Sequence, residues 1–187
     1  DKGTLFGIGV TQTLSEPWYA FAAVTGGTGA FYLPNVRVTA LLNRKLLPSR
    51  RLVVNAGGSY AKWKDAHNDR GLAAGALYYF ESPLILEVGT NRNFSYPGNV
   101  QSQSYFVTAI EGRPGAHVLV VRASGGREAY QVLAPGQPIA DFNSHSGSVT
   151  LRQWLTAKAG AVVGAEHYGN EFYQRNGFTL GAFWNLE

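Results

Sequence analysis

Alternation of apolar and polar residues is the main pattern along this chain. Helical spacing, with apolar residues at i, i+3, i+4 and i+7, fits no segment of useful length, whereas two-residue alternation recurs from one end to the other. The pattern predicts about eleven β-strands, at residues 4–14, 18–26, 35–46, 51–63, 70–80, 84–94, 103–112, 116–126, 146–157, 161–170 and 177–186. We therefore expect an all-β fold.

Most of these strands are long. Strands in soluble proteins usually have about five or six residues, whereas a tilted strand needs about nine to eleven residues to cross a bilayer. Residues 51–63, RLVVNAGGSYAKW, combine this length with one largely apolar face and two central glycines. Such a segment is expected to span a membrane, with one face in lipid and with glycines where the strand curves around a lumen.

The links between the strands also follow a pattern. Short corners are expected at 15–17, 48–50, 82–83, 113–115 and 158–160, and longer polar links at 27–34, 64–69, 95–102, 128–145 and 171–176. Strict alternation of short and long links is typical of an up-and-down outer-membrane barrel with periplasmic turns and extracellular loops. No composition shift divides the chain, so residues 1–187 are expected to form one barrel domain.

The two faces of the predicted strands differ. Lipid-facing candidates are Val36, Val38, Ala40, Leu42, Leu52, Val54, Ala56, Gly58, Tyr60, Phe178, Leu180, Ala182 and Trp184, and the opposite faces are smaller and more polar. Aromatic residues near strand ends predict a girdle at the membrane boundary: Trp18, Tyr19, Tyr60, Trp63, Tyr78, Phe94, Tyr168 and Trp184. The alternative interpretation is the core of a soluble β-sandwich.

Composition narrows the chemistry. The chain has no Cys, which excludes disulfides and thiolate chemistry. Its formal net charge is +4, but the basic residues are scattered, which argues against nucleic acid as a partner. The polar faces place Arg37, Arg51, Arg152, Asn55, Glu87 and Asn91 in a lumen, and Arg122 lies on a strand whose faces the sequence does not assign.

A lumen lined mainly by arginines would attract anionic solutes or polymers, because its low-dielectric wall concentrates counter-ions. In the alternative interpretation these arginines pair with Glu87, Glu111 and Glu166 and fill the interior, since small barrels often have packed interiors.

Catalysis is the weaker alternative. No histidine pair has metal-ligand spacing, so no metal or other cofactor is predicted. His145 stands beside Ser146 and Ser148, which suggests a hydrolase at the barrel rim, although neighbours in a strand point to opposite faces. Residues 166–170, EHYGN, are similar to the His-x-Ser segment of lipid A deacylases, but Gly169 occupies the nucleophile position. A non-enzymatic protein is therefore expected.

Residues 31–65, FYLPNVRVTALLNRKLLPSRRLVVNAGGSYAKWKD, and 76–89, ALYYFESPLILEVG, resemble the YaiO family of outer-membrane β-barrels. The resemblance rests on a Leu-Pro before an alternating strand, a short corner, a Gly-centred strand ending in aromatics, and a Tyr-Phe before the next corner. It implies location in the outer membrane of a Gram-negative bacterium, where some members follow a helical-repeat domain and are associated with envelope or exopolysaccharide systems. It implies no catalytic residues.

The function expected from this resemblance and from the lumen is a porin-like pore or export component. Outer-membrane lipid or lipopolysaccharide, anionic polysaccharide and small anions are the expected partners. The remaining alternative is a closed structural barrel that anchors a partner.

Strand parity raises one more expectation. An odd number of strands puts the start of the chain on the extracellular side, whereas bacterial single-chain barrels have an even number. Either a twelfth strand lies at 128–133, or upstream strands or a partner chain complete the ring; the resemblance favours a longer barrel of which this is the C-terminal part. Leu186-Glu187 are interpreted as an expression scar, with the native end near Trp184.

Overall fold

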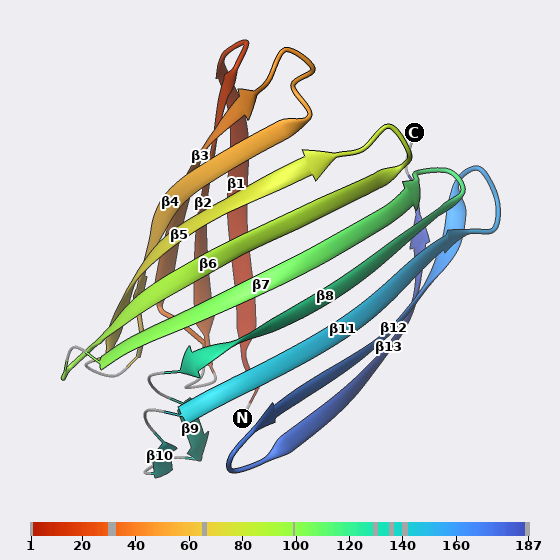
Figure 1. The fold of residues 1–187 in the computed structure, drawn as a ribbon. Coiled ribbons are helices and arrows are strands. Elements are labelled where there is room, and N and C mark those ends of the chain that lie inside the picture. The colour runs from red at the N-terminus through yellow and green to blue at the C-terminus, as the bar shows by residue number, and fades with distance from the viewer. Residues whose placement is uncertain are drawn as a thin grey trace.

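The computed structural model describes residues 2–29, 33–64, 67–98, 100–128, 131–134, 137–139 and 142–185. Eleven strands form one antiparallel sheet in which each strand pairs with its neighbours along the chain (Figure 1). In order across the sheet they are β1 (Thr4–Ser15), β2 (Trp18–Thr28), β3 (Val36–Leu46), β4 (Leu52–Lys62), β5 (Asn68–Tyr79), β6 (Leu84–Tyr96), β7 (Val100–Arg113), β8 (His117–Glu128), β11 (Phe142–Trp154), β12 (Ala159–Asn170) and β13 (Gln174–Trp184).

The predicted all-β, up-and-down fold is confirmed, and each of the eleven predicted strands is present. Several strands run further than the sequence pattern indicates. β6 continues to Tyr96 and β7 begins at Val100, with Ser95 directly opposite Val100. The extension crosses residues whose polarity suggests a loop, because one face of this sheet accepts polar side chains along its whole length.

The predicted strict alternation of short and long links is wrong. The links at 97–99 and 171–173, expected to be long, are as short as the corner at 114–116, because the flanking strands extend into them. The long link at 29–35 and the long connection after β8 do lie at the same end of the sheet. We call this the loop end and the opposite end the corner end.

The twelfth strand that the sequence suggested at 128–133 does not join the main sheet in the described part of the chain. β8 continues to Glu128 and pairs directly with β11, so nothing is inserted between them. Residues of this region instead form a separate hairpin, β9 (Gln131–Ala134) with β10 (Gln137–Ile139), which lies beyond the loop end (Figure 1). The number of strands in the main sheet is therefore odd.

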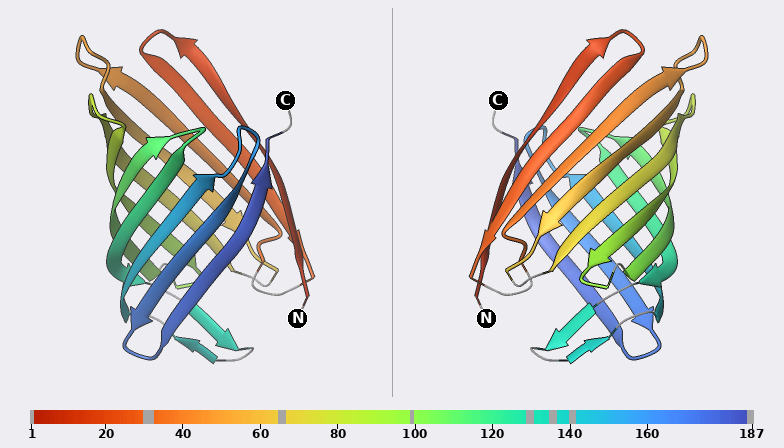
Figure 2. Two further views of the ribbon diagram at one scale, coloured as in Figure 1. Left: turned by 90° about the vertical axis from the view of Figure 1, so that its right-hand side faces the viewer. Right: turned by 90° about the vertical axis from the view of Figure 1, so that its left-hand side faces the viewer.

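The sheet curls into an incomplete barrel whose two outermost strands are β1 and β13 (Figure 2). Among the described residues, β1 pairs only with β2, and β13 pairs only with β12. The chain starts at the loop end and finishes at the corner end, so β1 and β13 run in the same direction (Figure 2).

Side chains alternate between the two faces of this curved sheet, and their burial distinguishes the faces. On β3 and β4, Asn43 and Val53 are 7% and 3% exposed, whereas Leu42 on the other face is 44% exposed. Side chains converge on the inner side of a curved sheet, so the buried positions mark the concave face. Residues directly opposite one another on paired strands share a face of the sheet. The pairing of each strand with its neighbour therefore assigns the concave and convex residues of every strand, starting from β3.

Candidate lumen and membrane-facing surface

The convex face is a continuous band of exposed apolar side chains. Phe178 and Leu180 are 88% and 84% exposed, and residues of the same kind follow on the other strands of the sheet. The band includes Phe6, Ile8, Val10, Val24, Val38, Leu42, Leu72, Leu86, Val88, Val107, Val121, Val149, Leu151 and Val163. Soluble monomers rarely expose an apolar patch this large. No second sheet covers it in the described part of the chain, so the β-sandwich interpretation is wrong.

Five of the aromatic residues predicted to form a girdle lie on the convex face. Trp18, Tyr78 and Trp184 lie near the corner end, and Tyr60 and Phe94 lie near the loop end. Tyr96 and Tyr105, which are 60% and 56% exposed, also lie on the convex face. Tyr105 was not predicted as a girdle residue, although alternation within the predicted strand at 103–112 places it on the same face as Val107.

The structure places the other three girdle candidates elsewhere. Tyr19 lies on the concave face, where the Lys45 Nζ is 5.8 Å from its ring centroid. Tyr168 also lies on the concave face and donates a hydrogen bond of 2.8 Å to Glu128 Oε1. Trp63, just after β4, donates from Nε1 to Asp69 Oδ2 at 2.8 Å. Consecutive residues such as Trp18 and Tyr19 cannot share a face of a strand.

The register puts five of the six lumen candidates on the concave face: Arg37, Asn55, Glu87, Asn91 and Arg152. Arg51 lies instead at the corner end, just before β4, and forms a 2.8 Å ion pair with Glu81 in the next corner. The hydrogen bond and the charge of Arg51 lower the pKa of the Glu81 carboxyl below its usual value. Arg51 therefore joins two corners.

Small residues dominate the rest of the concave face. They include Gly7, Gly9, Ala23, Thr39, Gly57, Ser59, Gly71, Ala73, Gly75, Gly89, Ser102, Ser104, Ser124, Ser146, Ser148, Thr150, Gly164, Thr179 and Gly181. Such side chains occupy little of the space that the sheet encloses. The face is therefore suited to line a channel.

Two concave arginines contact aromatic rings. The guanidinium carbon of Arg152 lies 3.8 Å from the ring centroid of Phe183 and 4.7 Å from that of Trp154. Arg122 lies 4.0 Å from the Phe106 centroid and donates to Thr108 Oγ1 at 3.0 Å. The register settles the face of Arg122, which the sequence left open. Stacking on rings fixes these cations without neutralising their charge.

The alternative of an arginine–glutamate plug gains little support from the described residues. Glu166 pairs with Arg175 at 3.6 Å, and Glu111 contacts His117 at 3.0 Å on the convex face near the corner end. No ion pair joins Arg37, Arg122 or Arg152 to a carboxylate in the part of the chain that the structure describes.

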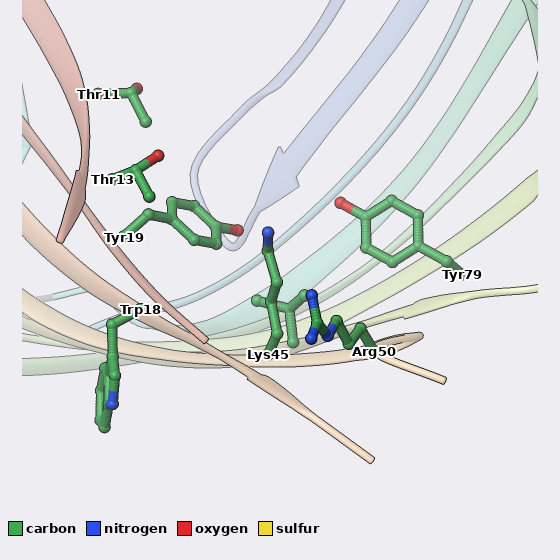
Figure 3. A pocket seen from close by; sticks show the side chains of 8 residues that line it. Thr11, Thr13, Trp18, Tyr19, Lys45, Arg50 and Tyr79 are labelled. Atoms are coloured by element: carbon green, nitrogen blue, oxygen red, sulfur yellow. The ribbon is translucent and has the colours of Figure 1, made fainter. Parts of the chain in front are cut away.

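A hollow of about 410 Å³ lies at the corner end of the concave face (Figure 3). Tyr19, Lys45 and Tyr79 project together on one side of the sheet, and Trp18 points to the other side (Figure 3). The remaining lining residues are Thr11, Thr13, Arg50 and Val53. Lys45 is thus a cation of the concave face that was not predicted from the sequence, although continued alternation beyond Asn43 would have found it.

At the loop end, Asp69 joins three side chains. Trp63 Nε1 donates to Oδ2, Ser95 Oγ donates to Oδ1 at 2.6 Å, and His67 Nε2 lies 3.0 Å from Oδ1. A nucleophilic triad needs a bond from Ser to His, whereas here both contact the carboxylate. These hydrogen bonds connect the start of the link after β4 to β5 and β6, so the cluster has a structural role.

The Ser–His pair suggested for a rim hydrolase is separated by the sheet. Ser146 and Ser148 lie on the concave face, where Ser146 Oγ is 2.7 Å from Ser124 Oγ. His145 lies on the convex face, and its ring centroid is 5.7 Å from that of His167. Opposite faces keep the imidazole away from both hydroxyls, so this hydrolase interpretation is wrong.

The described residues contain no helix long and apolar enough to span a bilayer. They also contain no group of three or more His, Asp or Glu side chains arranged to hold a metal ion.

A curved antiparallel sheet with an apolar convex face, aromatic residues at both ends and a polar concave face is the wall of a membrane β-barrel. Residues 1–131 match the family described as the YaiO membrane beta barrel domain. The chain belongs to this family and is an outer-membrane β-barrel. Comparison with curated proteins and with solved structures gave no match.

Proposed function

We propose that this chain forms the wall of a porin-like pore that passes anionic solutes or polymers, as part of an envelope or exopolysaccharide system in a Gram-negative bacterium. The concave face supports the proposal most directly, because it combines many small side chains with the basic residues Arg37, Lys45, Arg122 and Arg152. The link to exopolysaccharide rests on the family resemblance.

The electrostatics of the concave face favour anions modestly. Three carboxylates of this face already have partners. Asp69 accepts hydrogen bonds from Trp63 and Ser95, Glu128 accepts one from Tyr168, and Glu166 forms an ion pair with Arg175. Glu87 on β6 is opposite Thr108 on β7, which is opposite Arg122 on β8. The negative charge of Glu87 therefore partly offsets the positive charge of Arg122. Lys45 and Arg152 lie nearer the corner end, where they would set the sign of the field inside the pore.

A conducting pore also needs a closed ring. An unpaired strand edge is costly in hydrocarbon, because each unsatisfied backbone group costs several kcal/mol there. β1 and β13 run in the same direction, so an odd number of added strands would keep every pairing antiparallel and make the total even. We propose that such strands, from the same polypeptide or from a partner chain, complete the barrel.

Substituting Lys45 tests the pore. The Lys45→Gln protein is expected to lose anion selectivity relative to the native protein, because a lumen cation is removed. Arg44→Gln is the matched control: it removes one positive charge from the adjacent residue, which lies on the convex face over Trp18. The measurement is single-channel conductance in a planar bilayer, with selectivity taken from the reversal potential under a salt gradient.

Three results would contradict the proposal. Cation selectivity of the native pore would show that the basic residues do not control the lumen. An equal shift in both variants would show that the concave face is not the conducting surface. Absence of conductance from folded, heat-modifiable protein would mean a plugged or incomplete barrel, or a structural barrel that anchors a partner, rather than an open pore formed by this chain.

A further inference from the structure

Two histidines from neighbouring strands meet on the convex face near the loop end. His145 on β11 is directly opposite Gly169 on β12, and His167 lies two residues before Gly169 on the same face. The two imidazoles are therefore diagonal neighbours, and their ring centroids are 5.7 Å apart. Both histidines belong to paired strands, so the sheet fixes the backbone positions that carry them.

Gly169 leaves space for the two rings to approach one another. A Cβ at this position would lie 2.8 Å from Nε2 of His145 and 3.4 Å from Nε2 of His167. The Nε2 atoms of both imidazoles therefore lie above the same glycine. A side chain at this position would displace the ring of His145.

A hydrogen bond from the next strand orients His167. Its Nδ1 lies 2.7 Å from Oδ1 of Asn176 on β13, the residue directly opposite it. An amide oxygen only accepts hydrogen bonds, so Nδ1 of His167 is the donor and carries the proton. The lone pair of the neutral ring is then on Nε2, the nitrogen that lies above Gly169. Partners of this kind fix the tautomer and the ring orientation of histidines that bind metals.

The separation of the two rings fits a shared metal ion. Metal–nitrogen bonds of about 2.0–2.1 Å at roughly tetrahedral angles place the centres of two bound imidazoles about 5–6 Å apart. The observed separation of 5.7 Å lies in this range. Imidazole nitrogen is a preferred ligand of Zn²⁺ and Cu²⁺, and two imidazoles leave further coordination positions for water or for a donor from outside the chain.

Charged groups of both signs lie near the pair. Asn143, two residues before His145 on the same face, is opposite Arg127 on β8. The backbone N–H of Asn143 donates to Glu171 Oε1 at 3.5 Å. A guanidinium repels a bound cation and a carboxylate attracts it, so these two charges act in opposite directions. Binding would therefore depend on the imidazole nitrogens.

We propose that His145 and His167 bind a transition-metal dication, Zn²⁺ or Cu²⁺, through their Nε2 atoms, and that Asn176 positions His167. Spacing along the sequence did not suggest this pair, because the two histidines lie on different strands. The site is on the convex face, outside the proposed lumen. It lies at the edge of the apolar band, because Phe178, two residues after Asn176 on β13, is the next residue of that face and is 88% exposed.

A Cu²⁺ titration of protein purified without a histidine tag tests this site. Cu²⁺ is the probe because it binds nitrogen ligands most tightly among these dications, and its electron paramagnetic resonance spectrum reports the nitrogens that bind it. The tightest site of the native protein, folded in detergent micelles, is expected to hold one Cu²⁺ per chain through two imidazole nitrogens.

Removing either imidazole is expected to weaken this site strongly. His145→Gln and His167→Gln are each expected to bind Cu²⁺ at least about a hundredfold more weakly, with one imidazole nitrogen, because the second ligand of a tethered pair acts at a high effective concentration. Asn176→Ala is expected to keep both nitrogens and to weaken binding by about 10–100-fold, as loss of an orienting partner does.

The matched control is His117→Gln, which removes an imidazole from the convex face at the corner end, where it contacts Glu111. This variant is expected to bind Cu²⁺ as the native protein does, and heat-modifiability shows that each variant is folded. A one-nitrogen spectrum of the native protein, native affinity in His145→Gln or His167→Gln, or equal weakening in His117→Gln would each overturn the proposal. Native affinity in Asn176→Ala would overturn the positioning role of Asn176.

Discussion

Replacing Val88 by arginine is expected to destabilise the folded protein in a bilayer by about 2–4 kcal/mol. Val88 lies on the convex face of β6, between Ala76 on β5 and Val107 on β7, and 45% of it is exposed. An exposed valine in the middle of an apolar band faces hydrocarbon if the sheet spans a membrane, and an arginine at the membrane midplane of a barrel carries this cost. Reversible unfolding in lipid vesicles by guanidinium chloride measures the change.

Asn91→Arg on the same strand is the control. Asn91 lies on the concave face, opposite Ala73 and Ser104, so the new charge would enter a polar surface. The Asn91→Arg protein is expected to unfold within about 1 kcal/mol of the native protein, because lumen substitutions avoid the lipid. Similar losses for both variants, or a larger loss for Asn91→Arg, would mean that the convex face does not meet lipid.

Adding one methyl group at Gly57 is expected to cost about 1–3 kcal/mol, the usual range for overpacking. Gly57 is opposite Leu41 on β3 and Ala73 on β5. A Cβ there would collide with the Ala40 carbonyl oxygen and lie 2.7 Å from Leu41 Cδ2, so the backbone itself would have to move. Equilibrium unfolding of Gly57→Ala in the same vesicles checks the value.

Gly181→Ala provides the comparison, because no atom lies within 4 Å of the position that its Cβ would take. Gly181 also lies on the concave face of a strand, on β13. This variant is expected to be neutral or slightly stabilising, since alanine restricts the unfolded chain. A Gly57→Ala protein as stable as Gly181→Ala would contradict the close approach of β3 and β4.

Local alternation was enough to predict the eleven strands of the main sheet and the faces of several of them. Val38, Ala40 and Leu42 already face opposite to Thr39, Leu41 and Asn43 in the sequence, and the sheet keeps that arrangement. Parity also predicted that His145 and Ser146 would separate, and that the chain would start and finish at opposite ends. These features depend only on the two-residue period of a strand.

Features that join distant strands could not be predicted in the same way. The contacts of Asp69 with Trp63 and Ser95 require the register of three neighbouring strands, β4, β5 and β6. Tyr168 was assigned to the girdle because it lies near a strand end, but its face and its bond to Glu128 follow from its register with β11. The predicted lengths of the links were wrong because polar residues within strands are of the same types as the residues of loops.

A spin-label scan along β4 in lipid vesicles distinguishes a lipid-facing surface from a water-filled lumen. The chain has no native cysteine, so single cysteines at Val54, Ala56 and Tyr60 on the convex face, and at Asn55 and Ser59 on the concave face, can each be labelled alone. We expect convex labels to collide with lipid-soluble oxygen and concave labels to collide with a water-soluble nickel complex. Labels that show no alternation, or the reverse one, would contradict a wall that separates lipid from a lumen.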